Sequence, residues 1–167
     1  MARKKKELEQ NKKKVNTDSV VGLVGSTTEQ PVTETLEVNY MPYAMSVIVS
    51  RAIPEIDGFK PSHRKLLYTM YKMGLLTGGR TKSANIVGQT MQLNPHGDAA
   101  IYETMVRLAR GNETLLHPFV DSKGNFGKVY SRDMAYAASR YTEARLEGIC
   151  AELFKDIDSD TVDMVDN

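Results

Sequence analysis

The adjacent residues Arg140 and Tyr141 have the clearest potential for chemistry in this chain of 167 residues. A free tyrosine phenol has a pKa of about 10, so it is a poor nucleophile at neutral pH. A guanidinium beside it favours the phenolate and also neutralises a phosphate that approaches. The pair therefore indicates a nucleophile for a DNA phosphodiester, provided that DNA-binding elements surround it. The alternative is a packing tyrosine with a solvated hydroxyl.

A second group of residues is suited to hold the anionic substrate of such a nucleophile. Lys60, His63, Arg64 and Lys65 cluster at the start of a predicted helix. The first backbone N–H groups of a helix have no partner inside the helix, so this end can bind a phosphate. The alternative is a basic first turn that contacts only water.

An apolar arm and a helix are predicted around these cations. Residues 35–40 alternate weakly and are expected to be extended. Pro42 suits the first turn of a uniformly apolar helix that ends at Ile53 and should be buried, for example against a partner subunit. The next helix follows a turn at 58–62 and ends at Gly74. Its predicted core side chains are Leu66, Leu67, Met70, Tyr71 and Met73.

Two further helices form a predicted helix-turn-helix. The first runs from Ser83 to about Gln92, and a short turn leads to a second helix that has Asp98 as its N-cap and ends at Arg110. In such a unit the N-terminal residues of the second helix face the DNA, and here these are residues 96–100. The predicted inward side chains of the two helices are Ala84, Val87, Met91, Ile101, Met105 and Leu108.

A hairpin completes the predicted fold class, which is an α+β winged helix. Its strands are residues 116–120 and 126–130, joined by a turn at 121–125. Lys123 and Lys128 place positive charge on this wing, and Lys123 is a predicted DNA contact. A helix-turn-helix followed by a hairpin is typical of winged-helix domains. The predicted domain, an arm helix plus this winged helix, spans residues 34–167.

An apolar stripe at helical spacing follows Tyr141. It predicts a helix that starts between Thr142 and Arg145 and carries Cys150 in the core, where it is unreactive. An early start would place the positive end of this helix beside Tyr141 and stabilise the charged form of the phenol. The stripe comprises Leu146, Ile149, Cys150, Leu153, Phe154 and Ile157.

Composition narrows the class of protein. No apolar run approaches the roughly 20 residues that span a membrane, so a soluble, intracellular protein is expected. The single cysteine excludes a disulfide framework and a cysteine-based zinc site. Residues 1–33 are polar and are expected to form a disordered basic tail, with a non-specific DNA-binding arm as the alternative. The net charge is only +1, so any DNA site must be a local patch.

Neither a metal site nor a nucleotide site is predicted in this chain. The spacing of Asp156, Asp158 and Asp160 hints at a calcium loop, but Thr161 replaces the glycine of the sixth position and Asn167 the glutamate of the twelfth. A solvated acidic segment is the favoured interpretation. The sequence also lacks a GxxxxGK[ST] phosphate-binding loop.

Five short runs have the order and spacing of a known family. They are YAMSVIVSRAIP (43–54), DGFKPSHRK (57–65), PHGD (95–98), GNFG (124–127) and RYTE (140–143). From about Leu36 onward, over about four-fifths of its length, the chain resembles the A subunit of bacterial type IIA topoisomerases, DNA gyrase and topoisomerase IV.

This resemblance implies a covalent mechanism. Tyr141 would attack a DNA phosphodiester and form a transient 5′-phosphotyrosyl link that is later religated, and Arg140 would assist it. Arg51 matches an arginine that reaches the scissile phosphate from the partner of an A-subunit homodimer. In the family each half of the dimer cuts one strand, and a second duplex passes through the gap.

The resemblance also implies DNA contacts, cofactors and partners. Lys60, His63, Arg64 and Lys65 match the basic run that grips double-stranded DNA near the cut, and His96 lies in the motif that borders the cleavage site. The family works as an A2B2 heterotetramer. Its B subunit binds Mg²⁺ at an acidic site and binds and hydrolyses ATP, so neither cofactor is expected on this chain alone. A bacterial cytoplasmic location and no membrane partner are expected.

The sequence departs from the family at single positions. Asn94 stands where many members have histidine, so a two-histidine role at this turn is not expected. Ala99 stands where many members carry a serine that, with the acidic residue matched by Glu103, anchors quinolone drugs through a metal-bound water. We therefore expect weaker quinolone poisoning through this anchor. Lys65 replaces an arginine and loses its bidentate fork.

Length leaves other functions open. Family members are several times longer, so a fragment of the DNA breakage-reunion domain, without strand passage of its own, is expected. The main alternative is a winged-helix DNA-binding protein without cleavage activity, such as a regulator. A third is an interaction fragment that occupies the B subunit or poisons assembly of the full A subunit. Arg140 and Tyr141 favour the cleaving module over a regulator, because a regulator has no use for this pair.

Overall fold

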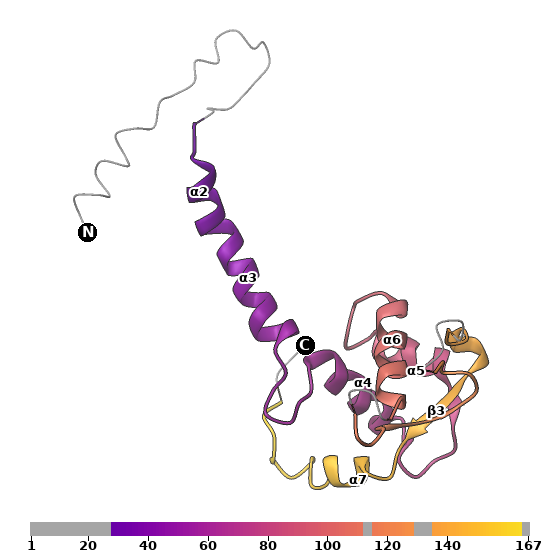
Figure 1. Ribbon diagram of the computed structural model, residues 1–167. Coiled ribbons are helices and arrows are strands. Elements are labelled where there is room, and N and C mark those ends of the chain that lie inside the picture. The colour runs from indigo at the N-terminus through magenta and orange to yellow at the C-terminus, as the bar shows by residue number, and fades with distance from the viewer. Residues whose placement is uncertain (1–27, 112–114, 129–134, 165–167) are drawn as a thin grey trace. The chain divides into compact units, whose positions relative to one another are not determined.

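The computed structural model describes residues 28–111, 115–128 and 135–164 (Figure 1). Two compact units divide the chain, with the boundary between Ala52 and Ile53. Most of the predicted disordered tail, residues 1–27, lies outside the described residues. Within the described ranges, no helix has the length and apolar character needed to cross a membrane.

The described part of the first unit is one run of helical backbone. Its consecutive parts are α2 (Val32–Thr35), η1 (Leu36–Tyr40), α3 (Met41–Val47) and η2 (Ile48–Ala52). The prediction of an extended segment at 35–40 is therefore wrong. Pro42 lies inside the helical run, where it lacks an N–H and its ring crowds the carbonyl four residues back. The wider π-helical turn of η1, just before it, accommodates this loss.

Apolar side chains of this helical run are exposed in the chain by itself. The expectation that the helix is buried is thus not met within its own unit, and Val49 is 70% exposed. A helix this apolar on several faces is typical of one that is covered by another protein surface. The exposed large apolar side chains are Val32, Leu36, Val38, Tyr40, Met41, Tyr43, Met45, Ile48 and Val49.

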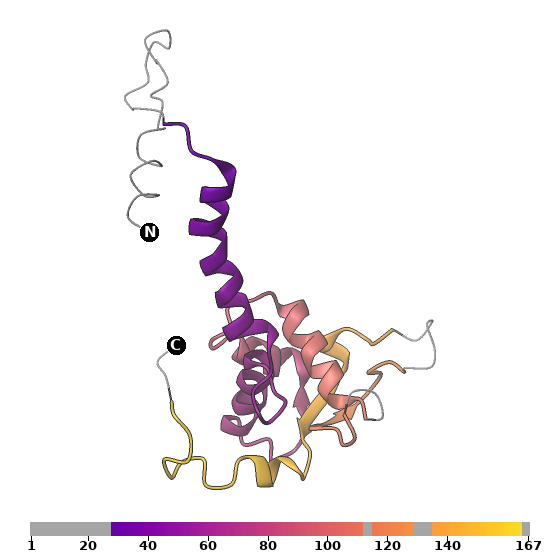
Figure 2. The same cartoon turned by 60° about the vertical axis from the view of Figure 1, so that its left-hand side comes forward.

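The second unit is α+β, which confirms the predicted fold class at this level. Its helices α4, α5 and α6 lie on the same side of the strand β3 in both views (Figures 1 and 2). The three strands form an antiparallel sheet in the order β1-β3-β2. The elements are α4 (Pro61–Lys72), β1 (Thr81–Lys82), α5 (Ser83–Thr90), α6 (Asp98–Ala109), β2 (Val120–Lys123), η3 (Ser139–Tyr141), β3 (Glu143–Leu146) and α7 (Cys150–Leu153).

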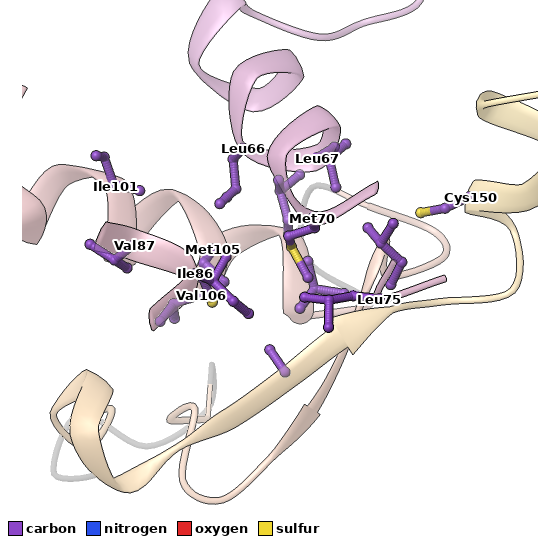
Figure 3. Close-up of a cluster of buried hydrophobic side chains, with 14 of the residues drawn as sticks. Leu66, Leu67, Met70, Leu75, Ile86, Val87, Ile101, Met105, Val106 and Cys150 are labelled. Carbon is purple, nitrogen blue, oxygen red and sulfur yellow. The ribbon is translucent and has the colours of Figure 1, made fainter. Parts of the chain in front are cut away.

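The hydrophobic core of this unit joins the three helices to the sheet. Leu66 and Met70 of α4, Ile86 of α5 and Met105 of α6 are fully buried (Figure 3). Burying each such side chain stabilises the fold by roughly 1.5–3 kcal/mol. The core predictions for Leu66, Leu67, Met70, Val87, Ile101, Met105 and Leu108 are confirmed.

The buried face of α5 differs from the predicted one. Ala84 and Met91 were predicted to point inward, but both are exposed. The buried face instead includes two hydroxyl-bearing residues, Ser83 and Thr90, which a search for apolar spacing passes over. Their hydroxyls form hydrogen bonds inside the protein, so no unpaired polar group is buried with them.

The sheet pairs other segments than the predicted hairpin. The first predicted strand, 116–120, is displaced, because β2 begins only at Val120. The predicted return strand, 126–130, is not a strand in its described part, and residues 129–130 lie outside the described residues. The partner of β2 is β3, whose inward side chains match those of β2: Val120 faces Leu146, and both are buried.

The prediction of a helix that starts between Thr142 and Arg145 is also wrong, because this segment is the strand β3. Ala144 and Leu146 are buried at a spacing of two, as in a strand with one covered face, and hydrogen bonds to both neighbours hold this strand. The next helix, α7, begins at Cys150. The core position of Cys150 is confirmed, and burial raises the pKa of its thiol to about 11, which makes it a poor nucleophile.

A carboxylate clamped by two guanidiniums ties the strands together. The Oδ2 atom of Asp121 on β2 accepts hydrogen bonds of 2.7 Å from Arg80, just before β1, and from Arg145 on β3. The side chain of Asp121 is only 17% exposed. Burial would raise the pKa of this carboxyl, but its bonds to the two guanidiniums outweigh burial and lower the pKa below its ordinary value of 3.8.

We expect Asp121→Asn to lower the free energy of unfolding by about 2 kcal/mol at neutral pH, because two charge-assisted hydrogen bonds are weakened. Urea unfolding measures this. Since the pKa of Asp121 is lowered by folding, its stabilisation is fully present above pH 3.8 and is lost as pH falls through the lower, folded-state value. Asp158→Asn, in an exposed pair with Lys72 at 3.8 Å, is the control and should change stability little. Equal effects of the two substitutions would contradict the clamp.

Candidate active site

Tyr141 is the last residue of the short helix η3. Thr142 follows with an extended backbone, and β3 begins at Glu143. Its side chain is 67% exposed. The guanidinium carbon of Arg140 lies over the tyrosine ring, 4.9 Å from the ring centroid. This cation–π contact lies on a surface that a large substrate can reach.

The backbone around Tyr141 is fixed on both sides. The N–H of Tyr141 donates to the carbonyl of Ala138 at 2.9 Å, which closes the η3 turn. The N–H of Ser83, the first residue of α5, donates to the carbonyl of Thr142 at 3.0 Å. A helix start beside Tyr141 was expected to stabilise the charged phenol. The segment after Tyr141 is the strand β3, so no helix end lies there to do so.

Three hydroxyls form a buried network next to Tyr141. The Oγ1 atom of Thr142 is 2.8 Å from the Ser83 hydroxyl and 3.0 Å from the Tyr102 hydroxyl. The Tyr102 hydroxyl donates in turn to the carbonyl of Ala137 at 2.7 Å. The network joins α5, α6 and both flanks of the tyrosine. Sequence reasoning missed all three residues, and the position of Thr142 directly after Tyr141 was the only signal.

The turn after β2 also reaches the tyrosine backbone. Gly124 has φ of +107°, and a Cβ atom there would lie 3.4 Å from the carbonyl oxygen of Tyr141 and 3.3 Å from Thr142 Cγ2. Only glycine fits this combination of a positive φ and a close approach without strain. The GNFG run thus packs directly against the residue that carries the candidate nucleophile.

The four basic residues predicted to bind an anion gather at the start of α4. Arg64 forms an ion pair with Asp57 at 2.7 Å, and Lys65 donates to the carbonyl of Leu93 at 2.8 Å. The backbone N–H of Lys60 donates to Nδ1 of His63 at 3.4 Å, which occupies this imidazole nitrogen as an acceptor.

His63 sits in an environment that disfavours its charged form. Burial lowers the pKa of its imidazole, and the nearby cations Lys60 and Arg107 lower it further. The ring also meets Phe59 edge-on, with centroids 6.2 Å apart.

We expect the stability of the protein to fall as pH drops below the ordinary histidine pKa of 6.5, because the unfolded chain then binds a proton that folded His63 resists. The stabilisation is fully present above pH 6.5 and is lost towards the lower, folded-state pKa. Urea unfolding at about pH 7.5 and about pH 5.5 measures this change. His63→Gln should remove part of the pH dependence, whereas His117→Gln, at an exposed position, should leave it in place. An unchanged dependence in His63→Gln would contradict this assignment.

A groove of about 890 Å³ gathers basic side chains from distant parts of the second unit. Lys60 and His63 line it from the start of α4, and Arg107 and Arg110 line it from the end of α6. Apolar side chains such as Phe119 form part of its floor. The carboxylates of Asp57 and Glu103 also line the groove, and Glu103 pairs with Arg107, so the groove combines a small excess of positive charge with apolar surface.

The remaining predicted positions lie on the turn before α6, on α6 itself and in the first unit. His96, Ala99 and Glu103 are all exposed, and Glu103 accepts a hydrogen bond of 2.8 Å from Arg107. The N-cap of α6 is Gly97, not the predicted Asp98. Arg51 is exposed in η2 of the first unit, so it belongs to a different compact unit from Tyr141.

Comparison with known proteins assigns the family. The profile of the DNA gyrase/topoisomerase IV A-subunit family matches residues 51–167. This chain belongs to that family. The match includes Tyr141 and every predicted site residue, and it confirms the resemblance of the sequence motifs to type IIA A subunits.

Individual relatives agree with this family. The DNA gyrase A subunit of Thermotoga maritima is 48% identical over 141 residues, which are 83% of this chain and 17% of the relative. That of Aminobacterium colombiense is 49% identical over 144 residues, or 84% of this chain and 17% of the relative. That of Staphylococcus aureus is 46% identical over 142 residues, which are 83% of this chain and 16% of the relative. The chain thus spans about one-sixth of the length of the curated relatives it matches.

The residues that the structure describes do not offer a metal site of their own. Within them, no three histidine, cysteine, aspartate or glutamate side chains come together as they would to hold an ion. These residues therefore do not by themselves fit the Mg²⁺ that the family resemblance implies.

Proposed function

We propose that this chain is part of the DNA-cleaving and rejoining module of a type II topoisomerase. The observation that carries the proposal is the exposed Tyr141, covered by the Arg140 guanidinium, in a chain of the gyrase and topoisomerase IV A-subunit family. The tyrosine oxygen forms a bond to phosphorus, and the bond from phosphorus to the 3′ oxygen breaks. The freed 3′ oxygen takes up a proton, and attack by this hydroxyl later reverses the step.

In this proposal the second unit is a winged helix in which β2 and β3 take the place of the predicted hairpin. Support comes from the packing of α5 against α6, which residues 91–97 connect, and from the exposure of residues 96–100 at the start of α6. That end of a recognition helix is the part that faces DNA in helix-turn-helix units. Lys60, His63, Arg64, Lys65, His96 and Lys123 are the proposed DNA contacts.

The proposal assigns the other components to partners. The B subunit supplies the Mg²⁺ site and hydrolyses ATP, and a second A subunit completes the homodimer within an A2B2 assembly. Arg51 would reach the scissile phosphate of the partner half. The exposed apolar side chains of the first unit are consistent with a role in such assembly, because they need another surface to cover them.

A cleavage assay tests the proposed function. The chain is mixed with its B subunit, Mg²⁺ and supercoiled plasmid, and the reaction is denatured with detergent. Broken DNA with covalently attached protein is the expected product, and a full-length A subunit of a relative serves as the positive control. Tight DNA binding without any covalent product, while the control cleaves, would favour the alternative of a winged-helix DNA-binding fragment without cleavage activity.

Quinolone response gives a further prediction. Ala99 lies on the exposed first turn of α6, and Glu103 follows one helical turn later on the same face. Because alanine has no hydroxyl to hold a metal-bound water, we expect Ala99→Ser to increase drug-stimulated cleavage about tenfold or more, the effect of one charge-assisted hydrogen bond. Drug titration of cleavage complexes measures this. If Ala99→Ser shows no gain in drug-stimulated cleavage, these two positions do not anchor the drug.

A further inference from the structure

The three strands align two lysines and a glutamate in a single row. Residue pairing places Lys82 of β1 and Lys123 of β2 on either side of Glu143 of β3. The Lys82 ammonium is 2.8 Å from Glu143 Oε1, and the Lys123 ammonium is 3.6 Å from Oε2. Two ammonium groups share one carboxylate, so the row carries a net charge of +1. We name these three residues the lysine row.

The lysine row is exposed and loosely held. The side chains of Lys82 and Lys123 are 56% and 70% exposed, so each ammonium still has N–H groups directed to solvent. The row of Asp121, two residues along the sheet, is different, because there the carboxylate is only 17% exposed and both guanidiniums bond it at 2.7 Å. The Asp121 row holds its partners firmly. The lysine row can exchange its partners at little cost, since exposed ion pairs contribute little to stability.

The lysine row lies directly beside the candidate nucleophile. Glu143 follows Tyr141 by two residues, and Thr142 between them has an extended backbone with φ of −109° and ψ of 155°. Burial alternates accordingly: Tyr141 is exposed, Thr142 is buried, and Glu143 is again partly exposed. Tyr141 and Glu143 therefore point to the same, solvent side of the chain.

We propose that the lysine row is a binding site for a DNA backbone phosphate next to the phosphate that Tyr141 attacks. Lys82 and Lys123 exchange the Glu143 carboxylate for the phosphate when the duplex docks. Glu143 holds the two ammonium groups apart and ready in the free protein, and it weakens DNA binding by competing for them. The inference rests on the proposed function for the location of the DNA.

Chemistry supports this exchange. A lysine ammonium binds phosphate as a point charge and tolerates the varied geometry of a passing backbone, whereas the forked guanidiniums of the neighbouring row are already engaged by Asp121. Glu143 remains ionised near neutral pH, because its hydrogen bond to Lys82 and the charges of both lysines lower its pKa. Its negative charge is thus present when DNA arrives.

The test is the salt dependence of binding of the whole chain to a fluorescent DNA duplex. Each lysine that contacts a phosphate adds about 0.9 to the slope of log affinity against log salt concentration. We expect Lys82→Gln and Lys123→Gln each to lower this slope by about 0.9, and Lys82→Arg to restore it. Lys72→Gln is the matched control, because Lys72 also forms an exposed pair, with Asp158, on another part of the same unit.

Glu143→Gln separates this site from a merely structural ion pair. We expect tighter DNA binding in this variant, and a larger gain than in Asp158→Asn, which makes the same charge change in the control pair. Thermal unfolding of every variant shows that it is folded before its binding is compared. Weaker binding by Glu143→Gln, or slopes for Lys82→Gln and Lys123→Gln equal to that of Lys72→Gln, would overturn the proposal.

The outcome is distinct from that of the cleavage assay. Altered slopes without a covalent product would leave the lysine row as a DNA contact and reject the proposed cleavage. A covalent product with unaltered slopes would leave the proposed cleavage in place and reject the lysine row.

Discussion

Tyr141→Phe should abolish covalent attachment of the protein to broken DNA while leaving the fold and DNA binding intact. The substitution removes only the oxygen that would attack phosphorus. Removing a nucleophile can cost on the order of a million-fold in rate, which places the product below detection. The side chain is largely exposed, so stability should change by no more than about 0.5 kcal/mol. The measurements are the detergent-trapped product, duplex binding and urea unfolding, all on one preparation.

Tyr136→Phe is the matched control for this experiment. Tyr136 is also exposed, at 40%, and its ring meets Tyr102 edge-on with a centroid distance of 5.5 Å. It loses the same hydroxyl five residues upstream, and the yield of covalent product should stay near that of the unaltered chain. A product that persists in Tyr141→Phe, or that disappears equally in both variants, would mean that another group is the nucleophile.

Gly124→Ala should lower both stability and cleavage. The backbone there has φ of +107°, which a side chain disfavours, and the added Cβ would press on the Tyr141 carbonyl and on Thr142. We expect a loss of about 1–3 kcal/mol in the free energy of unfolding. Because the strain acts on the backbone of the nucleophile, the cleavage rate should fall by more than the loss of folded protein explains. Urea unfolding and the rate of product formation, compared at equal folded concentration, measure the two effects.

Gly88→Ala, at another glycine of the same unit, should have the opposite effect on stability. Gly88 lies inside α5, and a Cβ there meets no atom within 4 Å. Alanine should therefore stabilise the helix by roughly 0.5–1 kcal/mol and leave cleavage unchanged. If the two variants change stability and the cleavage rate equally, the close approach at Gly124 does not matter for cleavage.

Local patterns predicted the helices α4, α5 and α6 well. The spacing of Leu66 and Met70, the stop at Gly74 and the apolar face of α6 all follow from interactions within a few residues of chain. Tyr141 and Arg140 could be selected as the candidate site from sequence, because the pair is contiguous and its chemistry depends on residue type. Family motifs added the cations of α4 and the positions on α6.

The sheet was predicted poorly because its pairing is set by contacts between distant residues. Leu146 and Cys150 fit a helical spacing as well as the end of a strand, and only the hydrogen bonds to β1 and β2 decide between them. The lysine row and the hydroxyls around Thr142 were missed for a related reason. Their members come from three separate segments each, and no single stretch of sequence shows that they meet.

The hydroxyl contacts of Thr142 have a consequence for the timing of catalysis. Ser83 and Tyr102 hold the Thr142 side chain, and they also bond the carbonyls of Thr142 and Ala137, so the main chain on both sides of Tyr141 is anchored before DNA arrives. In the proposed reaction, such pre-organisation would lower the entropy loss in the activation barrier and raise the effective concentration of the phenol at its target. After the proposed break, the same rigidity would hold the captured end in place, so that resealing would recover the original junction.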